Sequence, residues 1–180
     1  PGSVAIMTLR IHLLSLFAAV SLNAQVTVTA ERISTKPILL PGDMWASAGR
    51  FNPAAILVGN KTVLLFRARD GAGTSRIGYA ESADGLHFMV RPDPVLSPES
   101  AYEKGGGVED PRVVQIEGTY YLTYTSYNGR DAQLCLATSQ DLIHWKRRGI
   151  IMPAYKGKWN TQWTKSGAII PWRIHGAWWM

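Results

Sequence analysis

Residues 82–88 (SADGLHF) recur 57 positions later as residues 139–145 (SQDLIHW). Both copies keep serine, aspartate and histidine at the same spacing and end on an aromatic residue. Gly59, Gly118 and Gly176 follow nearly the same interval, and each precedes an apolar or aromatic run. Self-similarity at a fixed period is the signature of a repeat architecture. The recurrence therefore predicts one structural unit of 57 to 58 residues, present two to three times.

Each unit has the pattern of four short strands. In the second unit we expect these strands at residues 112–116, 120–126, 133–139 and 145–148. Asn128-Gly129 lies between two of them, and Asn-Gly is a strong hairpin signal. Helical periodicity is not evident outside the first two dozen residues. Four antiparallel strands repeated around an axis form a β-propeller, so we predict an all-β fold with the innermost strand of each blade lining a central pocket.

The chain is expected to contain a leader and one domain. Residues 7–10 are a short basic start, residues 11–22 are almost entirely apolar, and Ala24 is a small residue near a cleavage point. This pattern is typical of a secretory signal peptide, and the alternative is a buried N-terminal helix. We therefore assign residues 1–24 to upstream residues and a signal peptide, which places the mature protein in a secreted or periplasmic location.

Residues 25–180 are then a partial, truncated β-propeller catalytic domain. Residues 175–180 end just after a turn, inside an expected strand, so we expect only the first two to three blades of a propeller.

Composition narrows the classes of ligand. The formal net charge is +6 and the basic residues are dispersed, apart from residues 146–148. Such a balance permits an anionic ligand without requiring one and does not indicate a nucleic-acid partner. Cys135 is the only cysteine, which excludes an intramolecular disulfide and a cysteine-based zinc site. No apolar run after the leader has membrane-spanning length, and we expect no metal ion and no organic cofactor.

Residues 105–112 (GGGVEDPR) are the first candidate for chemistry. Three consecutive glycines suit a loop whose main chain passes close to another group. Glu109 and Asp110 follow, Pro111 restricts φ, and Arg112 begins the expected inner strand of the second blade. A carboxylate delivered to the mouth of that strand can act as a general acid. The alternative is a glycine-rich turn with solvated charges.

Several segments together resemble glycoside hydrolase family 130, which comprises β-mannoside phosphorylases and related mannosidases on a five-bladed propeller. They are residues 51–55, 65–70, 75–78, 107–112, 120–125 and 165–169, which occur in the family's order. The Glu-Asp-Pro-Arg element with its flanks is the most specific. Arabinosidases and fructosidases on five-bladed propellers share the same repeat rhythm and remain an alternative.

The resemblance implies roles for individual residues. Asp110 matches the general acid, which in this family protonates the leaving oxygen through a hydroxyl of the bound mannose. Asn52 resembles the family's sugar-contacting asparagine. Lys165 enters the third blade where Asp110 enters the second, and it resembles a phosphate-binding lysine. Arg130 is the candidate for the arginine that accompanies it, with a solvated turn arginine as the alternative.

Five more residues, Arg67, Arg69, Asp70, Glu109 and Arg112, are expected to contribute to substrate binding. Arg67 and Arg69 share one face of a strand, where they contact sugar hydroxyls or phosphate, or pair with Asp70 or Asp110. Glu109 either positions Asp110 or adjusts its acidity, or it forms a salt bridge with Arg112.

The expected function is cleavage of β-mannosidic bonds with inversion, by phosphorolysis or hydrolysis. The partners are a β-mannoside oligosaccharide and, in phosphorolysis, inorganic phosphate as co-substrate, and a homo-oligomer is compatible with both. The alternative from another class is a non-catalytic carbohydrate-binding propeller whose tryptophans stack on sugars. The repeated histidines, His87 and His144, are expected to be structural.

Overall fold

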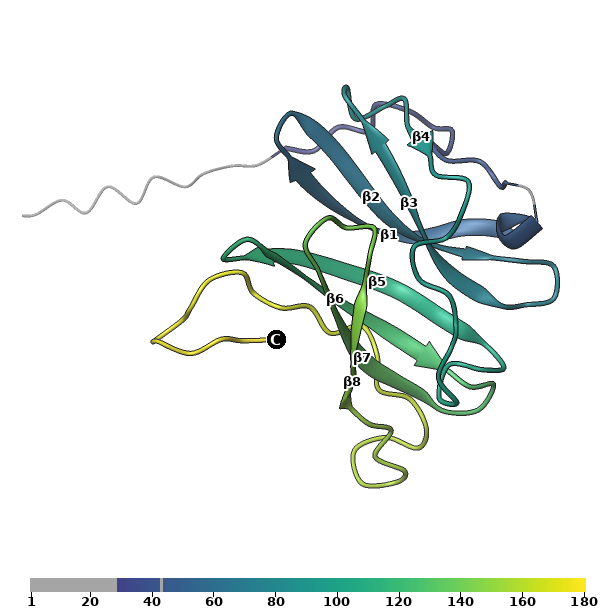
Figure 1. Cartoon of the computed structure of the whole chain (residues 1–180), viewed down its shortest axis with the longest axis vertical. Coiled ribbons are helices and arrows are strands. Elements are labelled where there is room, and N and C mark those ends of the chain that lie inside the picture. The colour runs from purple at the N-terminus through teal and green to yellow at the C-terminus, as the bar shows by residue number, and fades with distance from the viewer. Residues whose placement is uncertain (1–28, 43) are drawn as a thin grey trace, which may run out of the picture. The chain divides into compact units, whose positions relative to one another are not determined.

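The computed structural model describes residues 29–42 and 44–180 (Figure 1). The chain divides into two units, Pro1–Ile33 and Ser34–Met180, and the second holds all the described strands. The expected signal peptide lies outside the described residues. Within the described part of the chain, no helix is long and apolar enough to cross a membrane.

The expected all-β fold is confirmed (Figure 1). A three-residue 3-10 helix, η1 (Met44–Ala46), precedes the first four-stranded blade. That blade consists of β1 (Gly49–Val58), β2 (Lys61–Arg69), β3 (Ser75–Ser82) and β4 (Met89–Val90). The second blade consists of β5 (Gly107–Ile116), β6 (Thr119–Tyr127), β7 (Ala132–Ser139) and β8 (Lys146–Met152). Successive strands within each blade pair antiparallel, and one parallel pairing, Ser75 with Gly107, links the two blades.

A third unit begins at Trp163. Trp163 forms a parallel bridge with Ala132, which repeats the link between Ser75 and Gly107 one unit later. Ile174 and Ala177 pair across a turn whose two residues both have positive φ, as do Glu117 and Gly118 in the second blade. The predicted interval of 57 to 58 residues therefore corresponds to the blades.

The expected loop over residues 105–110 is wrong. β5 begins at Gly107, so Glu109 and Asp110 lie inside the strand, where a β-bulge interrupts its pairing with β6. The backbone there is buried because it packs closely against its neighbours. A Cβ on Gly106 would meet the Tyr127 ring, and a Cβ on Gly107 would meet the backbone of Ser75. Gly107 thus allows close approach between the blades, and Gly106 allows close approach within the second blade.

The hydrophobic core lies where the blades pack together. Along β2, Val63 and Leu65 belong to a core cluster that includes Val108, Leu122 and Tyr124 of the second blade. Phe66 and Ala68, on the opposite face of β2, belong to a separate cluster within the first blade. Cys135 is fully buried, as expected for a small apolar residue, and burial raises the pKa of its thiol.

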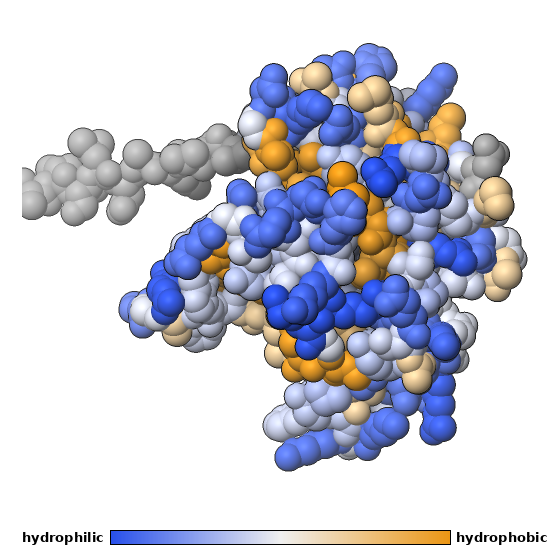
Figure 2. Space-filling view, viewed as in Figure 1, coloured by the Kyte–Doolittle hydropathy of each residue, from blue (hydrophilic) through white to orange (hydrophobic). Residues whose placement is uncertain are grey.

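Figure 2 shows that hydrophilic residues cover most of one face, with hydrophobic residues in separate strips.

One buried carboxylate fastens the segment between the blades to the second blade. Glu103 is fully buried, and its Oε2 accepts hydrogen bonds from the backbone N–H groups of Glu99 (2.8 Å) and Ser100 (3.0 Å). Its Oε1 accepts hydrogen bonds from the Tyr124 hydroxyl (2.8 Å) and the Arg147 guanidinium (3.0 Å). Burial alone would raise the pKa of Glu103, but these hydrogen bonds outweigh it and lower the pKa below its ordinary value.

Replacement of Glu103 should destabilise the fold strongly. Glu103→Gln removes the charge that four donors share, so we expect a loss of about 2–4 kcal/mol in the free energy of unfolding. Glu99→Gln is the control because the Glu99 side chain is 73% exposed beside the same arginine, and its loss should cost at most about 1 kcal/mol. Urea unfolding at neutral pH measures both, and equal losses would contradict a central role for Glu103.

The same carboxylate predicts a pH dependence. The folded-state pKa of Glu103 lies below its unfolded value, near 4.5. Its contribution is therefore complete above that value and is lost as the pH falls through the folded-state pKa. Wild-type stability should decrease below about pH 4.5, with a smaller decrease for Glu103→Gln. Parallel curves for the two proteins would contradict the assignment.

Gly107→Ala tests the close approach of the blades. Gly107 has φ 111° and no space for a Cβ, whereas Gly118 has φ 79° and open space around it. Alanine at Gly118 should cost about 1 kcal/mol from backbone strain alone. Alanine at Gly107 should cost about 1–3 kcal/mol more, because atoms must also move apart. Thermal unfolding of the two variants gives the comparison, and equal losses would show that the contact between Gly107 and Ser75 is unimportant.

Candidate active site

Five side chains from both blades form one hydrogen-bonded group, which we call the carboxylate cluster: Asn52, Arg67, Ser75, Glu109 and Asp110. Asn52 donates from Nδ2 to Oδ1 of Asp110 at 2.7 Å. The Arg67 guanidinium donates from Nη2 to Oε1 of Glu109 at 2.7 Å, and its Nη1 lies 3.5 Å from Oδ1 of Asp110. Glu109 and Asp110 are 6% and 7% exposed, so a single cation compensates two adjacent, buried carboxylates.

The repeat explains why these residues meet. The inner strands β1 and β5 contact each other, and each has a β-bulge at the same point of its unit. Asn52 and Asp110 lie in these bulges with φ of 45° and 49°. Asparagine and aspartate tolerate this left-handed conformation better than other non-glycine residues. Strained backbone of this kind concentrates at functional sites.

Arg67 reaches the carboxylates because of strand alternation. It lies on the same face of β2 as Val63 and Leu65, which pack against the second blade. The arginine at the end of this apolar face therefore points toward β5, where it meets Glu109 and Asp110.

The two oxygens of Asp110 differ. Oδ1 is held by Asn52 and lies near Arg67. Among residues 29–42 and 44–180, no group donates a hydrogen bond to Oδ2. A carboxyl group with one fixed oxygen and one free oxygen can offer the free oxygen to a ligand as acceptor or, when protonated, as donor.

Glu109 is bound within the cluster by two donors. Arg67 donates to its Oε1, and so does the Ser75 hydroxyl at 3.2 Å. Arg112 instead donates to the carbonyl of Pro111 at 2.7 Å, so the predicted alternative of a salt bridge between Glu109 and Arg112 is wrong. No sequence motif indicates Ser75 as a site residue, because its role depends on the pairing between β3 and β5.

Arg69 and Asp70 lie outside the cluster. Arg69 donates from Nε to the carbonyl of Gly73 at 3.2 Å. Asp70 pairs with Arg76 at 2.7 Å and accepts a hydrogen bond from the backbone N–H of Thr74. The hydrogen bond from Arg76 holds the pKa of Asp70 below its ordinary value. The described contacts of both residues thus stabilise the turn between β2 and β3, and the expected pairing of Asp70 with the arginines of β2 does not occur.

The expected correspondence between Lys165 and Asp110 is wrong by one residue. Ser166, with φ 68°, is the residue of the third unit that shares the positive φ of Asn52 and Asp110. Lys165 therefore corresponds to Glu109 and not to Asp110. Two consecutive bulge residues reach different surroundings, so this shift decides which residues Lys165 faces.

Lys165 lines a hollow of about 200 Å³ between the blades, together with Arg67, Glu109, Tyr127, Ala132 and Trp163. Its ammonium lies 4.8 Å from the centroid of the Trp163 ring, which is the geometry of a cation–π contact. The Trp163 ring also meets Tyr127 edge-on. The hollow therefore joins Lys165 to the edge of the carboxylate cluster.

The Arg130 side chain remains on the surface. It is 78% exposed, and its Nε lies 4.0 Å from Oδ1 of Asp131. The indole N–H of Trp163 donates to the carbonyl of Arg130 at 3.2 Å. The backbone of Arg130 is thus linked to the hollow, whereas its guanidinium does not line it.

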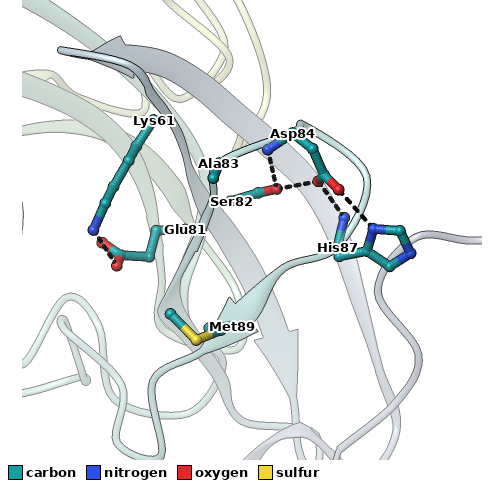
Figure 3. Close-up of a pocket in the computed structure, with 7 residues that line it drawn as sticks. All are labelled: Lys61, Glu81, Ser82, Ala83, Asp84, His87 and Met89. Atoms are coloured by element: carbon teal, nitrogen blue, oxygen red, sulfur yellow. Dashed lines mark hydrogen bonds and ion pairs between the residues drawn. The ribbon is translucent and has the colours of Figure 1, made fainter.

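The Ser-x-Asp turn of the first blade lines a separate hollow (Figure 3), and the second copy of the turn lines a hollow of its own at the second blade. Asp84 accepts hydrogen bonds from the backbone N–H groups of Leu86 and His87, and its Oδ2 lies 2.7 Å from Nδ1 of His87. Asp141 and His144 repeat this arrangement in the second blade. The contact with Asp84 raises the pKa of His87. These histidines order turns, in agreement with the expectation.

No three histidine, cysteine, aspartate or glutamate side chains in the described part of the chain are grouped closely enough to hold a metal ion.

A family model matches most of the chain. The model of glycoside hydrolase family 130, described as beta-1,4-mannooligosaccharide phosphorylase, matches residues 25–180. A 1,2-beta-oligomannan phosphorylase from Thermoanaerobacter sp. (strain X514) is 38% identical over 161 residues, which cover 83% of this chain and 51% of that protein.

Two solved structures of glycoside hydrolases are also similar to this chain. A glycosyl hydrolase from Bacteroides ovatus is 33% identical with a TM-score of 0.63, over 72% of this chain and 42% of that chain. A structure from the group of family 130 glycoside hydrolases that target beta-1,2 mannosidic linkages in Candida mannan is 34% identical with a TM-score of 0.60, over the same two shares.

The chain spans about half the length of the curated relatives it matches. Its two four-stranded blades and the start of a third are part of a five-bladed propeller, as expected. The chain belongs to glycoside hydrolase family 130.

Proposed function

We propose that this protein cleaves β-mannosidic bonds with inversion, with Asp110 as the general acid and inorganic phosphate as the nucleophile. The observation that carries the proposal is the asymmetry of Asp110, whose Oδ1 is held by Asn52 while Oδ2 receives no hydrogen bond from any described residue. That free oxygen can deliver a proton toward the leaving oxygen, directly or through a hydroxyl of the bound mannose.

Glu109 is poorly suited to activate water. An inverting hydrolase needs a second carboxylate about 6.5–9.5 Å from the acid, on the opposite face of the sugar. Glu109 and Asp110 are adjacent and contact the same guanidinium, so they cannot flank a sugar from opposite faces. Phosphate, which brings its own negative charge, removes the need for that second carboxylate.

Lys165 supports the phosphate role because its ammonium faces a hollow and pairs with no carboxylate in the described part of the chain. Arg130 is the second phosphate ligand in this proposal. Its long, exposed side chain can turn toward an anion bound at Lys165, and Trp163 already connects the two. Asn52 and Arg67 then bind sugar hydroxyls beside the acid.

The substrate proposed first is a β-1,2-linked mannoside. The curated relatives are named as phosphorylases of 1,2-beta-oligomannan and beta-1,2-mannobiose, whereas the family description names the β-1,4 linkage. Assays with β-1,2- and β-1,4-mannobiose side by side distinguish the two linkages.

Hydrolysis is the second candidate. The secretory pattern of residues 1–24 favours it, because a sugar phosphate formed in a secreted or periplasmic location is harder to use. The similarity to family 130 glycoside hydrolases supports it as well. In that case the second carboxylate comes from outside the described residues.

Asp110→Asn should remove most of the activity of the protein. General acid catalysis contributes about 10²- to 10⁴-fold, so kcat on β-1,2-mannobiose should fall by that factor. Asp84→Asn, in the outer turn of the first blade, is the control and should keep wild-type kcat. Retention of wild-type kcat by Asp110→Asn on a natural mannoside would refute the assigned acid. Sugar binding without turnover by the wild type would instead support a carbohydrate-binding propeller.

Lys165→Ala should chiefly weaken the dependence on phosphate. Loss of one charge-assisted hydrogen bond should raise the KM for phosphate about 10- to 100-fold. Lys158→Ala is a matched control, because Lys158 also lies over a tryptophan, Trp159, but does not line the hollow. The KM for phosphate is obtained from initial rates at increasing phosphate concentration, with the products sugar phosphate and free mannose measured separately. Release of free mannose at a rate indifferent to phosphate would show hydrolysis.

A further inference from the structure

Ser75 is a fully buried serine at the junction of the two blades. Its backbone N–H donates to the carbonyl of Gly106 at 2.8 Å, and it pairs with Gly107 in the parallel link between β3 and β5. The glycine leaves no room for Ser75 to shift, because even a Cβ on Gly107 would overlap the Ser75 backbone. The position of the Ser75 hydroxyl is therefore determined by the packing of one blade against the other.

The Ser75 hydroxyl closes a ring of three hydrogen bonds. Arg67 donates from Nε to Oγ of Ser75 at 3.0 Å. Ser75 Oγ donates to Oε1 of Glu109 at 3.2 Å, and Arg67 Nη2 donates to the same Oε1 at 2.7 Å. With Nε and Nη2 both engaged, the plane of the guanidinium is set, and Nη1 is left facing Oδ1 of Asp110 at 3.5 Å.

We propose that Ser75 is a positioning residue for the acid: it holds Arg67 on Glu109 so that Arg67 does not occupy the free oxygen of Asp110. Because Ser75 is fully buried, it acts through Arg67 and not by contact with substrate. This inference rests on the proposed function, in which Oδ2 of Asp110 delivers the proton.

The chemistry of arginine explains why such a restraint is needed. A guanidinium prefers to bind a carboxylate through two parallel hydrogen bonds. Asp110 lies within reach of Arg67, and its Oδ2 has no donor among the described residues. Without the Ser75 hydroxyl, Nε of Arg67 loses a buried acceptor, and the guanidinium can rotate onto both oxygens of Asp110. That arrangement would block the proton-donating oxygen of the carboxyl group.

Ser75→Ala in the whole protein should therefore lower kcat on β-1,2-mannobiose about 10- to 100-fold and leave KM within about twofold, since the effect falls on the transition state. Ser75→Cys, which keeps the size of the side chain but hydrogen-bonds weakly, should behave in the same way if the alanine variant folds poorly. Ser139→Ala is the matched control. Ser139 is also buried and hydrogen-bonded, but in the outer turn with Asp141, so its loss should leave kcat unchanged at a similar cost in thermal stability.

A double-mutant cycle separates positioning from general destabilisation. If Ser75 acts through Glu109 and Arg67, adding Ser75→Ala to Glu109→Gln should lower kcat by less than about threefold more, because coupled residues are not additive. Ser139→Ala should have the same small effect in both backgrounds. A full, multiplicative loss from Ser75→Ala in the Glu109→Gln background would overturn the proposal, as would wild-type kcat in both Ser75 variants.

A measurement without turnover tests the contact itself. The Nε–H NMR signal of Arg67, assigned by its loss in Arg67→Lys, should be protected from hydrogen exchange in the wild type and in Ser139→Ala. In Ser75→Ala it should shift and lose protection, and an unchanged signal would overturn the proposal. If the wild type does not cleave mannosides, the proposed function fails while this readout still decides whether Ser75 holds Arg67.

Discussion

The shared guanidinium of Arg67 is the interaction on which the candidate site depends. Glu109 and Asp110 are adjacent, almost fully buried and acidic, and two such groups would repel each other without a compensating cation. Arg67 contacts both carboxylates from the neighbouring blade. Arg67 thus compensates the charges of both carboxylates and also links the two blades. The site therefore forms only when the blades pack together.

Repetition supplies the geometry of that contact. Both blades place a bulge at the same point of the inner strand, with positive φ at Asn52 and Asp110, and Ser166 repeats the positive φ in the third unit. Because the inner strands β1 and β5 contact each other, the side chains of Asn52 and Asp110 converge. Asn52 donates to Asp110 across 58 residues of sequence. Three copies of one backbone feature thus present an amide, a carboxyl and a hydroxyl, so the units share a conformation and differ in chemistry.

The remaining charged groups differ in whether they have partners within the described chain. Glu103, Asp70, Asp84 and Asp141 have their hydrogen-bonding capacity used within the described chain. Lys165 and the free oxygen of Asp110 do not. Lys165 is exposed, so water can solvate its ammonium, and both groups remain available to a ligand. This contrast distinguishes the site from the hollows around the histidine turns.

The sequence by itself determined the repeat and the all-β class, because periodicity is a property of the chain. Its motifs, and their resemblance to family 130, also predicted Asn52, Arg67, Glu109 and Asp110 as site residues, together with Arg69, Asp70 and Arg112, which lie outside the carboxylate cluster. The sequence did not reveal Ser75, the register of Lys165 or the outward roles of Arg69 and Asp70. The register of Lys165 follows from the positive φ of Ser166, and the role of Ser75 follows from its parallel pairing with Gly107. Arg69 and Asp70 instead contact the turn between β2 and β3. Only the tertiary structure decided them, since strand alternation turns a one-residue shift into a change of face.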